Sequence, residues 1–381
     1  MNQKYMSFLT HTIAFCLGLL LVLVPVNLRA AGGTGKLGEL EALIEEKFIG
    51  EADVAAMEDA AAGAMVEALG DRWSYYLSAQ DYQAHMETMN NAYVGIGITV
   101  TAGEDGFSIL EVTEGGGGAE AGLRVEDLVI AVAGQDVRAM DTTALRSLVR
   151  GEEGSFVEVT VLREGRELTL SVERRRYETP VATGQLLEGN VGLVTIANFD
   201  ARCAQETIAA IEALESQGAD RFVFDVRDNP GGYAHELIAV LDYLLPEGEI
   251  FHTEYYNGHE DISHSDEAFL DYPMAVLVNG DSYSAAEFFA AALQEYGAAT
   301  VVGTQTCGKG YFQQTYELSD GSAVGLSVGK YYTPQGRNLA GLGITPDIPV
   351  PLTEEESRSL TYNQLPPQSD PQIQSAIQAL E

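Results

Sequence analysis

The sequence predicts a multi-domain α/β protein in which a helical arm, a β-rich domain and a βαβ-type unit follow one another. Apolar residues first recur at helical spacing, as over residues 40–48 and 57–69. From residue 93 to residue 172 they alternate along short runs instead, which is typical of strands. From residue 191 onward, strand-like runs alternate with helical ones, as they do in βαβ crossovers. A chain of 381 residues is long enough for two or three such domains.

The chain is strongly acidic, with 57 Asp and Glu residues against 21 Lys and Arg residues and a formal net charge of −36. No basic stripe is present that could displace phosphate counterions, so the charge disfavours nucleic acid and anionic membrane surfaces as partners. The one basic run, Arg174-Arg175-Arg176, is predicted to be a solvated linker. Partners are therefore expected to be neutral or basic.

Residues 1–31 have the features of an export signal. A lysine stands at position 4, an apolar run follows over residues 13–26, and small residues stand at Ala30 and Ala31. The run is shorter than the roughly 20 apolar residues that span a bilayer, and Pro25 interrupts its end. This favours a signal peptide cleaved near Ala30 over an uncleaved signal anchor. Either way the body is expected to be exported, and so secreted or anchored to the outer face of the cell membrane.

The N-terminal arm, residues 36–91, is predicted to form two or three amphipathic helices. The tract from Gly70 to Ser78 breaks the helical period with turn-forming and aromatic residues. Taken alone, this tract is interpreted as a helical cap or a dimerisation arm.

The β-rich region contains two glycines, Gly95 and Gly97, beside an apolar strand predicted over residues 93–100. Such glycines can expose consecutive backbone N–H groups, which suits capture of a peptide carboxylate and addition of the peptide as an extra strand. The alternative is a plain turn that needs positive φ, and without further context this alternative is favoured. The one clear helix of the region is expected over residues 142–149.

In the βαβ-type region, Gly231 and Gly232 stand between a buried strand, residues 221–226, and a helix, residues 234–245. Glycines in that position can aim free N–H groups at a developing negative charge. The same pattern also occurs in ordinary strand-to-helix turns.

Two polar residues, Ser284 and Lys309, stand out in the stretch from residue 275 to residue 314. Ser284 lies where a strand turns into a helix, and a full helix and strand return the chain to the same edge before Lys309. A lysine between glycines at the end of an apolar strand can be desolvated, which lowers its pKa and lets the amine accept the serine proton. The alternative for Ser284 is a helix N-cap, with Glu287 completing a capping box, and local sequence alone favours the cap.

Three other chemistries are not supported. Residues 303–309 match the start of a P-loop, but Gly310 replaces the Ser or Thr that would hold Mg²⁺ and a strand pattern follows. His259 and His264 are five residues apart, whereas the helical zinc motif needs four. No G-x-S-x-G elbow is present for a histidine-based triad. No cofactor and no metal are expected. Outside the signal, Cys203 and Cys307 could pair, but two free buried thiols are favoured.

Several ordered segments of the β-rich region carry a resemblance to a known module. They are the loop Gly95-Ile96-Gly97-Ile98, residues 118–123, residues 122–132 and the turn at Gly134. In this order they resemble a PDZ domain, which implies that the region binds peptides. The segment Gly115 to Gly118 departs from the pattern, because PDZ domains of this type usually have Ser-Pro there.

A second resemblance runs from about Leu37 to Leu380. Its core consists of Ser282-Tyr283-Ser284-Ala285-Ala286-Glu287, Gly308-Lys309-Gly310 and Gln313, with residues 225–232, 332–337 and 343–348 as further matching segments. These segments look like those of the C-terminal processing peptidases, also called tail-specific proteases. Tyr283, Ala286 and Cys307 replace the family's usual residues, as does Trp73 in the helical arm.

The resemblance implies roles for the candidate residues. Ser284 would be the nucleophile, Lys309 the general base and Gln313 the group that orients the lysine. The N–H of Ala285, with that of Gly231 or Gly232, would form the oxyanion hole. The peptide-binding candidates of the PDZ domain are Tyr93, Gly95, Ile96, Gly97 and Ile98.

The resulting prediction is an exported serine endopeptidase that binds apolar C-terminal tails of protein substrates and cleaves nearby through an acyl-enzyme. An activating partner protein and a homodimer are further expectations. The rival hypothesis is a non-catalytic peptide-binding scaffold. The expected domains are residues 1–31 (signal), 36–91 (helical arm), 92–175 (PDZ domain), 176–352 (Ser-Lys protease core) and 353–381 (polar tail with a short helix).

Overall fold

The computed structural model describes residues 35–103, 105–361 and 364–381. The signal expected over residues 1–31 lies outside this part of the chain. The chain divides into two units, residues 1–69 and residues 70–381. No helix among the described residues is both long enough and apolar enough to cross a membrane.

The described part of the first unit, residues 35–69, contains helices α2 (Lys36–Lys47) and α3 (Val54–Glu67). Asp53 caps α3 by accepting the N–H of Ala56, as a short polar side chain does at an N-cap. Neither helix has a buried residue. Large apolar side chains are therefore exposed along this unit: Leu37, Leu40, Leu43, Phe48, Ile49, Met65 and Leu69.

The second unit begins with strand β1 (Tyr75–Leu77) and helix α4 (Ala79–Met89). Strand β1 pairs antiparallel with β18 (Ala323–Tyr332), and Tyr75 faces Gly325. A Cβ on Gly325 would lie 2.3 Å from the Tyr75 ring, so a glycine is needed there. Residues 75–77 therefore form a strand of the core and not the helical cap that was one interpretation of residues 70–78.

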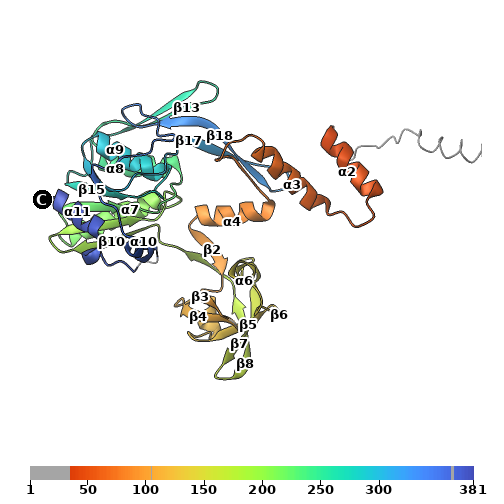
Figure 1. Cartoon of the computed structure of the whole chain (residues 1–381). Helices are drawn as coiled ribbons and strands as arrows, with labels where there is room; N and C mark the ends of the chain where they lie inside the picture. Colours follow the sequence, from red (N-terminus) through yellow and green to blue (C-terminus); the bar gives the residue numbers. More distant parts are fainter. Residues whose placement is uncertain (1–34, 104, 362–363) are drawn as a thin grey trace, which may run out of the picture. The chain divides into compact units, whose positions relative to one another are not determined.

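The β-rich domain is a sheet with the strand order β3-β4-β5-β7-β8, and β6 pairs with β5. Strand β3 lies at one edge of this sheet (Figure 1). Inward-facing side chains such as Phe107, Val132 and Val159 form its own buried core. The elements are β3 (Ile98–Gly103), β4 (Gly106–Val112), α5 (Gly117–Ala121), β5 (Leu128–Val132), β6 (Gln135–Asp136), α6 (Thr142–Val149), β7 (Phe156–Arg163) and β8 (Arg166–Glu173).

Two paired strands, β2 (Ala92–Gly95) and β9 (Arg175–Glu178), connect this domain to the rest of the unit. The single strand expected over residues 93–100 is thus divided, because Gly97 turns the chain at φ 70°. The basic run is not a solvated linker. The Arg174 guanidinium donates to the carbonyls of Leu148 and Val149 at the end of α6, where a helix favours a cation.

The main sheet of the core has the order β10-β11-β12-β15-β16-β19. Strands β11, β12, β15, β16 and β19 run parallel to one another, and β10 pairs antiparallel with β11 at the edge. A helix lies in each crossover from β11 through β12 and β15 to β16, as the predicted βαβ pattern requires, whereas β17 and β18 lie between β16 and β19. The elements are β10 (Ala182–Leu187), β11 (Val191–Ile196), α7 (Cys203–Ser216), β12 (Arg221–Asp225), α8 (Ala234–Leu244), β15 (Met274–Val278), α9 (Ala285–Glu295), β16 (Ala299–Gly303) and β19 (Ile348–Pro349).

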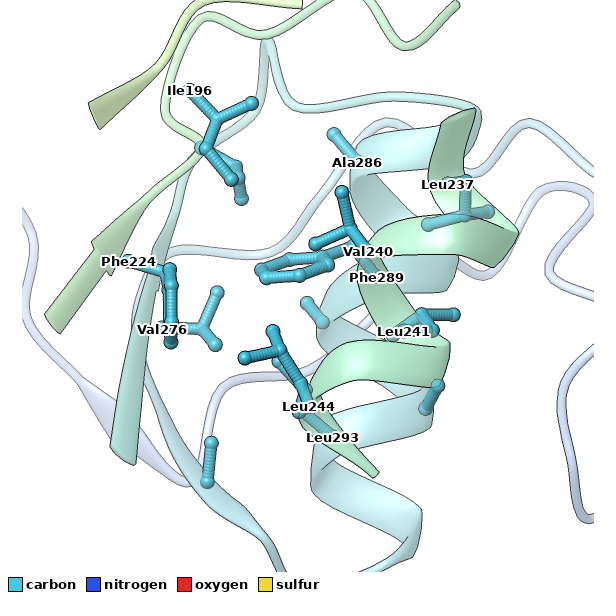
Figure 2. Packing of buried hydrophobic residues seen from close by; sticks show 14 of the residues in the cluster. Ile196, Phe224, Leu237, Val240, Leu241, Leu244, Val276, Ala286, Phe289 and Leu293 are labelled. Atoms are coloured by element: carbon cyan, nitrogen blue, oxygen red, sulfur yellow. The ribbon is translucent and has the colours of Figure 1, made fainter. Parts of the chain in front are cut away.

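Both faces of this sheet are covered. On one face, the ring of Phe289 from α9 lies among Phe224 and Val276 of the strands and Val240 of α8, with no polar side chain drawn among them (Figure 2). On the other face, Ile373 and Ala376 of helix α11 (Pro371–Ala379) are buried in a second cluster. Continuous burial explains why the strands are apolar along their length instead of alternating.

A second sheet of the core has the order β1-β18-β13-β14, with β17 also paired to β18. Strands β13 (Gly248–Tyr255) and β14 (Glu260–Ser265) form an antiparallel hairpin in this sheet. Strand β17 spans Tyr311–Glu317, and the C-terminal region holds α10 (Glu354–Thr361) and the 3₁₀ turn η1 (Pro367–Ser369). Both cysteines are free, as favoured above, but only Cys203 is buried and Cys307 is partly exposed.

Candidate active site

The candidate residues gather at the carboxyl ends of parallel strands, where open α/β sheets usually place their ligand sites. Gly232 follows β12, Ser284 follows β15 and Lys309 follows β16. These three residues line one cavity of about 230 Å³, together with Ala285 and Gln313. The rest of its wall is mainly apolar and aromatic, with Leu237, Phe251, Tyr255, Phe288, Phe312 and Tyr331.

Ser284 has a strained backbone, with φ 58° and ψ −125°, in a region that non-glycine residues seldom occupy. Its hydroxyl lies 3.0 Å from the Tyr331 hydroxyl, and the residue is 9% exposed. Gly231 permits this conformation, since a Cβ there would lie 2.7 Å from the Ser284 Cβ. Ser284 also begins helix α9, and its N–H donates to Glu287 at 3.0 Å. The cap and the functional role are therefore compatible at this residue.

Lys309 is a desolvated lysine. Burial lowers the pKa of its amine from 10.5 to about 8, while the neighbouring Cys307, Glu287 and Asp71 oppose that shift. Roughly a tenth of such an amine is neutral at pH 7. No hydrogen bond joins Ser284 to Lys309 in the part of the chain that the structure describes. The serine hydroxyl must therefore turn from Tyr331 toward the amine before a proton can pass between them.

Tyr331 keeps its proton, because burial raises the pKa of its phenol well above 10. Its ring packs edge-on against Phe288, with the ring centroids 4.3 Å apart. Tyr331 was not identified from the sequence. The signal that could have revealed it is a tyrosine at an inward-facing position of a long strand.

Gln313 lies on β17 in the cavity wall. Its amide donates to the Ser327 hydroxyl at 3.0 Å and to the Tyr311 carbonyl at 3.3 Å. The contacts of this amide thus tie Gln313 to β18 and not to Lys309. The expected role of Gln313 in orienting the lysine stays a prediction.

The two glycines of the expected oxyanion hole differ. The Gly231 N–H donates to the Asn229 side chain at 2.8 Å and is already engaged. Among the described residues, the N–H groups of Gly232 and Ala285 have no hydrogen-bond partner. Ala285 is the first residue of α9, where an N–H is free of helical bonds. Of the two alternatives to pair with Ala285, the geometry therefore favours Gly232.

Glu287 is the functional residue whose importance the sequence interpretation missed, since it was considered only as a capping partner. Its carboxylate is fully buried and accepts four hydrogen bonds. One oxygen accepts from the Thr306 hydroxyl at 2.5 Å and the Gly308 N–H at 2.7 Å. The other accepts from the backbone N–H groups of Ser284 at 3.0 Å and Lys309 at 2.9 Å. Glu287 thus fixes the backbones of both candidates of the dyad.

A larger cavity of about 740 Å³ adjoins the first and shares Ser284 and Lys309 with it. Its opposite wall comes from α4 and the residues before β1, including Trp73 and Met86. The site is therefore open to an extended ligand on this side.

The β-rich domain has a groove between β3 and α6, with a cavity of about 60 Å³. Ile96 and Ile98 line it, as expected of peptide-binding residues. Gly97 lies between them and is restricted to glycine, since a Cβ would lie 2.5 Å from the Tyr177 hydroxyl. The other wall residues come from β3, β5, β7 and α6 and were not named from the sequence: Val100, Val129, Thr142, Leu145, Arg146, Val149 and Val159.

Tyr93 and Gly95 do not lie in this groove. Both belong to β2, which pairs with β9, and the Tyr93 ring stacks on Tyr177 with 5.4 Å between ring centroids. Their place is the connection between the domain and the core. Sequence proximity to Gly97 suggested a binding role, but the turn at Gly97 separates them from the groove.

Asp200 lies beside the glycine loop and is an unusual carboxylic acid. It is 5% exposed, and its Oδ1 has no hydrogen-bond partner in the described chain. A Cβ on Gly232 would lie 2.6 Å from this oxygen. Burial, with a smaller contribution from the Glu236 charge, raises the pKa of Asp200 from 3.8 to about 7.

The substitution Asp200→Asn is expected to stabilise the protein above pH 7. Native Asp200 holds its proton up to about pH 7, whereas unfolded aspartate loses it near pH 3.8. The wild type thus loses stability as the pH rises between these values, and asparagine does not. Urea unfolding should show a gain on the order of 2–4 kcal/mol at pH 8 that vanishes near pH 4. The exposed Asp220→Asn serves as control, and a gain independent of pH would contradict the explanation.

Among the described residues, no group of three or more His, Cys, Asp or Glu side chains could hold a metal ion. His252, His259 and His264 lie on or beside the β13–β14 hairpin. His259 faces Asp261 at 3.1 Å, so it has an acidic neighbour of its own.

A strained serine at a helix start, with a buried lysine in the same cavity and an edge-strand groove in a second domain, is the arrangement expected of a serine-type endopeptidase with a PDZ domain. Comparison with known proteins supports this class. Residues 190–350 match the model of peptidase family S41, and residues 108–163 match a PDZ domain.

The chain belongs to the C-terminal processing protease family. It is 30% identical over 322 residues to the carboxy-terminal processing protease CtpA of Bacillus subtilis, covering 84% of this chain and 69% of that protein. It is 31% identical over 349 residues to a carboxyl-terminal-processing protease of a Picosynechococcus species, covering 89% and 83%. A solved S41 protease fold from Bacteroides fragilis matches with a TM-score of 0.51 at 16% identity, covering 92% and 98%. The predicted family, fold class and enzyme class are thereby confirmed.

Proposed function

We propose that the protein is an extracytoplasmic endopeptidase that binds the apolar C-terminal tail of a protein substrate in its PDZ groove and cleaves with a Ser284–Lys309 dyad. The observation that carries this proposal is the strained Ser284 in one cavity with a lysine whose pKa burial lowers to about 8. Export rests on residues 1–31, which lie outside the described residues.

The neutral Lys309 amine takes the proton of the Ser284 hydroxyl as the serine oxygen attacks the scissile carbonyl carbon. The carbonyl oxygen becomes an oxyanion, which the N–H groups of Ala285 and Gly232 stabilise. When the C–N bond breaks, the Lys309 ammonium returns the proton to the departing amine and an acyl-enzyme remains. Lys309 then deprotonates a water molecule, which attacks the ester and releases Ser284. The apolar cavity receives the side chain on the acyl side of the cleaved bond.

Ser284→Ala and Lys309→Met are each expected to reduce cleavage of a protein with an apolar, unstructured tail by at least about ten-thousandfold. The exposed Lys330→Met is the matched control and should keep wild-type activity. In the wild type, kcat/KM should rise with pH through about 8, because the neutral amine is the active form. If the wild type cuts no faster than the two variants, even with a partner protein supplied, the protease proposal is wrong and the protein is a non-catalytic peptide-binding scaffold.

The groove of the PDZ domain is expected to set tail affinity. Strand β3 is an edge strand beside α6, so a substrate tail can extend the sheet there. Ile98→Glu should raise KM for a tailed protein on the order of tenfold, since a charge replaces an apolar wall. The exposed Leu110→Glu is the control in the same sheet. Hydrolysis of a small ester should be unchanged in both variants. An unchanged KM for Ile98→Glu would contradict a role of the groove.

The activating partner and the homodimer stay predictions. The exposed apolar side chains of α2 and α3 are the surface that a second copy would cover. Sedimentation of the full chain, with and without these helices, would test this expectation.

A further inference from the structure

The amine of Lys309 lies against an aromatic side chain that is far away in the sequence. The centroid of the Trp73 ring is 4.8 Å from Lys309 Nζ. The same ring is 6.4 Å from the ring of Tyr283, the residue before Ser284. Trp73, Ser284 and Lys309 all line the larger cavity. We propose that Trp73 is a positioning residue for the Lys309 base, whose indole fixes the amine beside Ser284 and excludes water from it. This inference rests on the proposed dyad.

Trp73 is itself held rigidly. Its backbone N–H donates to the Asp71 carboxylate at 3.2 Å, and the Ser74 hydroxyl donates to the same carboxylate at 2.6 Å. The Ser74 hydroxyl in turn accepts the Ser327 N–H of β18 at 3.1 Å. Since the Ser327 hydroxyl also accepts the Gln313 amide, one hydrogen-bonded chain joins Gln313 to the turn that carries Trp73. The backbone that carries the indole is thus fixed to the core.

The indole acts on both forms of the lysine. By displacing water it favours the neutral amine, which is the form that accepts the serine proton. The face of its ring also attracts a cation, and most strongly in a desolvated site. Once Lys309 carries the serine proton, the Glu287 carboxylate cannot serve as its dedicated partner because four other donors occupy it. The face of the Trp73 ring therefore stabilises the transient ammonium. A paired carboxylate would instead keep the proton on Lys309.

The Trp73 ring is one of the groups that bury the Lys309 amine. The net shift of Lys309 is downward, to about 8, and its first cause is burial. A smaller apolar side chain at position 73 would admit water, so the pKa of the amine would rise toward 10.5. A phenylalanine would keep an aromatic face and much of the volume. The charged or titratable groups that face this pair are Asp71, Arg72, Tyr75, His85, Tyr283, Glu287 and Cys307.

Trp73 is the single tryptophan of the chain, so its fluorescence reports directly on this contact. In the full chain carrying Ser284→Ala, we expect the tryptophan emission to titrate with a midpoint near pH 8, as the ammonium loses its proton. Lys309→Met should remove this step. Cys307→Ser should leave it in place, which excludes the neighbouring thiol as its source.

The kinetic arm uses Trp73→Leu and Trp73→Phe in the otherwise wild-type chain, with a small ester as substrate. For Trp73→Leu, we expect the midpoint of kcat/KM against pH to rise by about one unit and kcat at pH 7 to fall about tenfold. KM should change little, and Trp73→Phe should recover most of the activity. A purely structural role would lower kcat equally at every pH, in step with the folded fraction measured by circular dichroism.

The outcomes separate the two proposals. If Lys309→Met retains activity, the dyad itself is wrong. If Lys309→Met is inactive but Trp73→Leu keeps the wild-type pH midpoint, Trp73 does not position the base. The absence of a Lys309-dependent step in the emission would likewise overturn the role of Trp73 while leaving the dyad intact.

Discussion

Glu287→Gln is expected to lower kcat/KM by at least about a hundredfold and to destabilise the fold by about 3–5 kcal/mol. Each carboxylate oxygen of Glu287 accepts two donors inside the protein. An amide presents one oxygen and one NH₂ group, so two buried donors would face another donor. The backbone must then shift either at Ser284 and Lys309 or at Gly308, the residue before Lys309, and the geometry of the dyad is lost.

Urea unfolding and ester hydrolysis would measure the two effects of Glu287→Gln separately. Glu212→Gln, on the exposed surface of α7, is the control for the same chemical change. A variant with wild-type stability and wild-type kcat/KM would show that the four hydrogen bonds are dispensable.

Arg227→Met is expected to destabilise the protein by about 3–5 kcal/mol, because it leaves two carboxylates buried without a counter-charge. The Arg227 side chain is 2% exposed and donates to both oxygens of Asp225, at 2.8 and 2.6 Å. It also donates to Asp370 at 2.7 Å and to Gln372 at 2.8 Å. Asp370 caps helix α11, so this guanidinium joins the end of β12 to the C-terminal helix.

The matched control is Arg221→Met, at the start of β12. Arg221 pairs with Asp220 at the surface, where such a pair contributes less than about 1 kcal/mol. Denaturant titrations at pH 7 should separate the two variants clearly. Equal unfolding midpoints would show that the buried network has no net role in stability.

Much of the fold could be predicted because its signals are local. Continuous apolar runs predicted the parallel strands, and the residues around Ser284 and Lys309 follow those strands directly. The shared cavity then follows from topology, since parallel strands end at one edge of their sheet.

The parts that could not be predicted depend on contacts between distant segments. Nothing near Trp73 or Tyr331 in the sequence indicates that one meets Lys309 and the other meets Ser284. Glu287 looked like an ordinary capping partner because its other donors come from residues 306–309. The hydrogen bond from the Gln313 amide to Ser327 depends in the same way on the register of β17 against β18. The strand pattern alone does not fix this register.

The pairing of β1 with β18 also bears on the order of assembly. Tyr75 and Thr315 share a hydrogen bond across 240 positions of the chain, with the whole PDZ domain between them. Contacts between residues so far apart in the sequence are expected to form late. The entropy lost in closing the loop between them is offset only once the intervening parts have folded. Trp73 therefore reaches Lys309 after the rest of the core is in place. We therefore expect the segment that is synthesised early to complete the base site last.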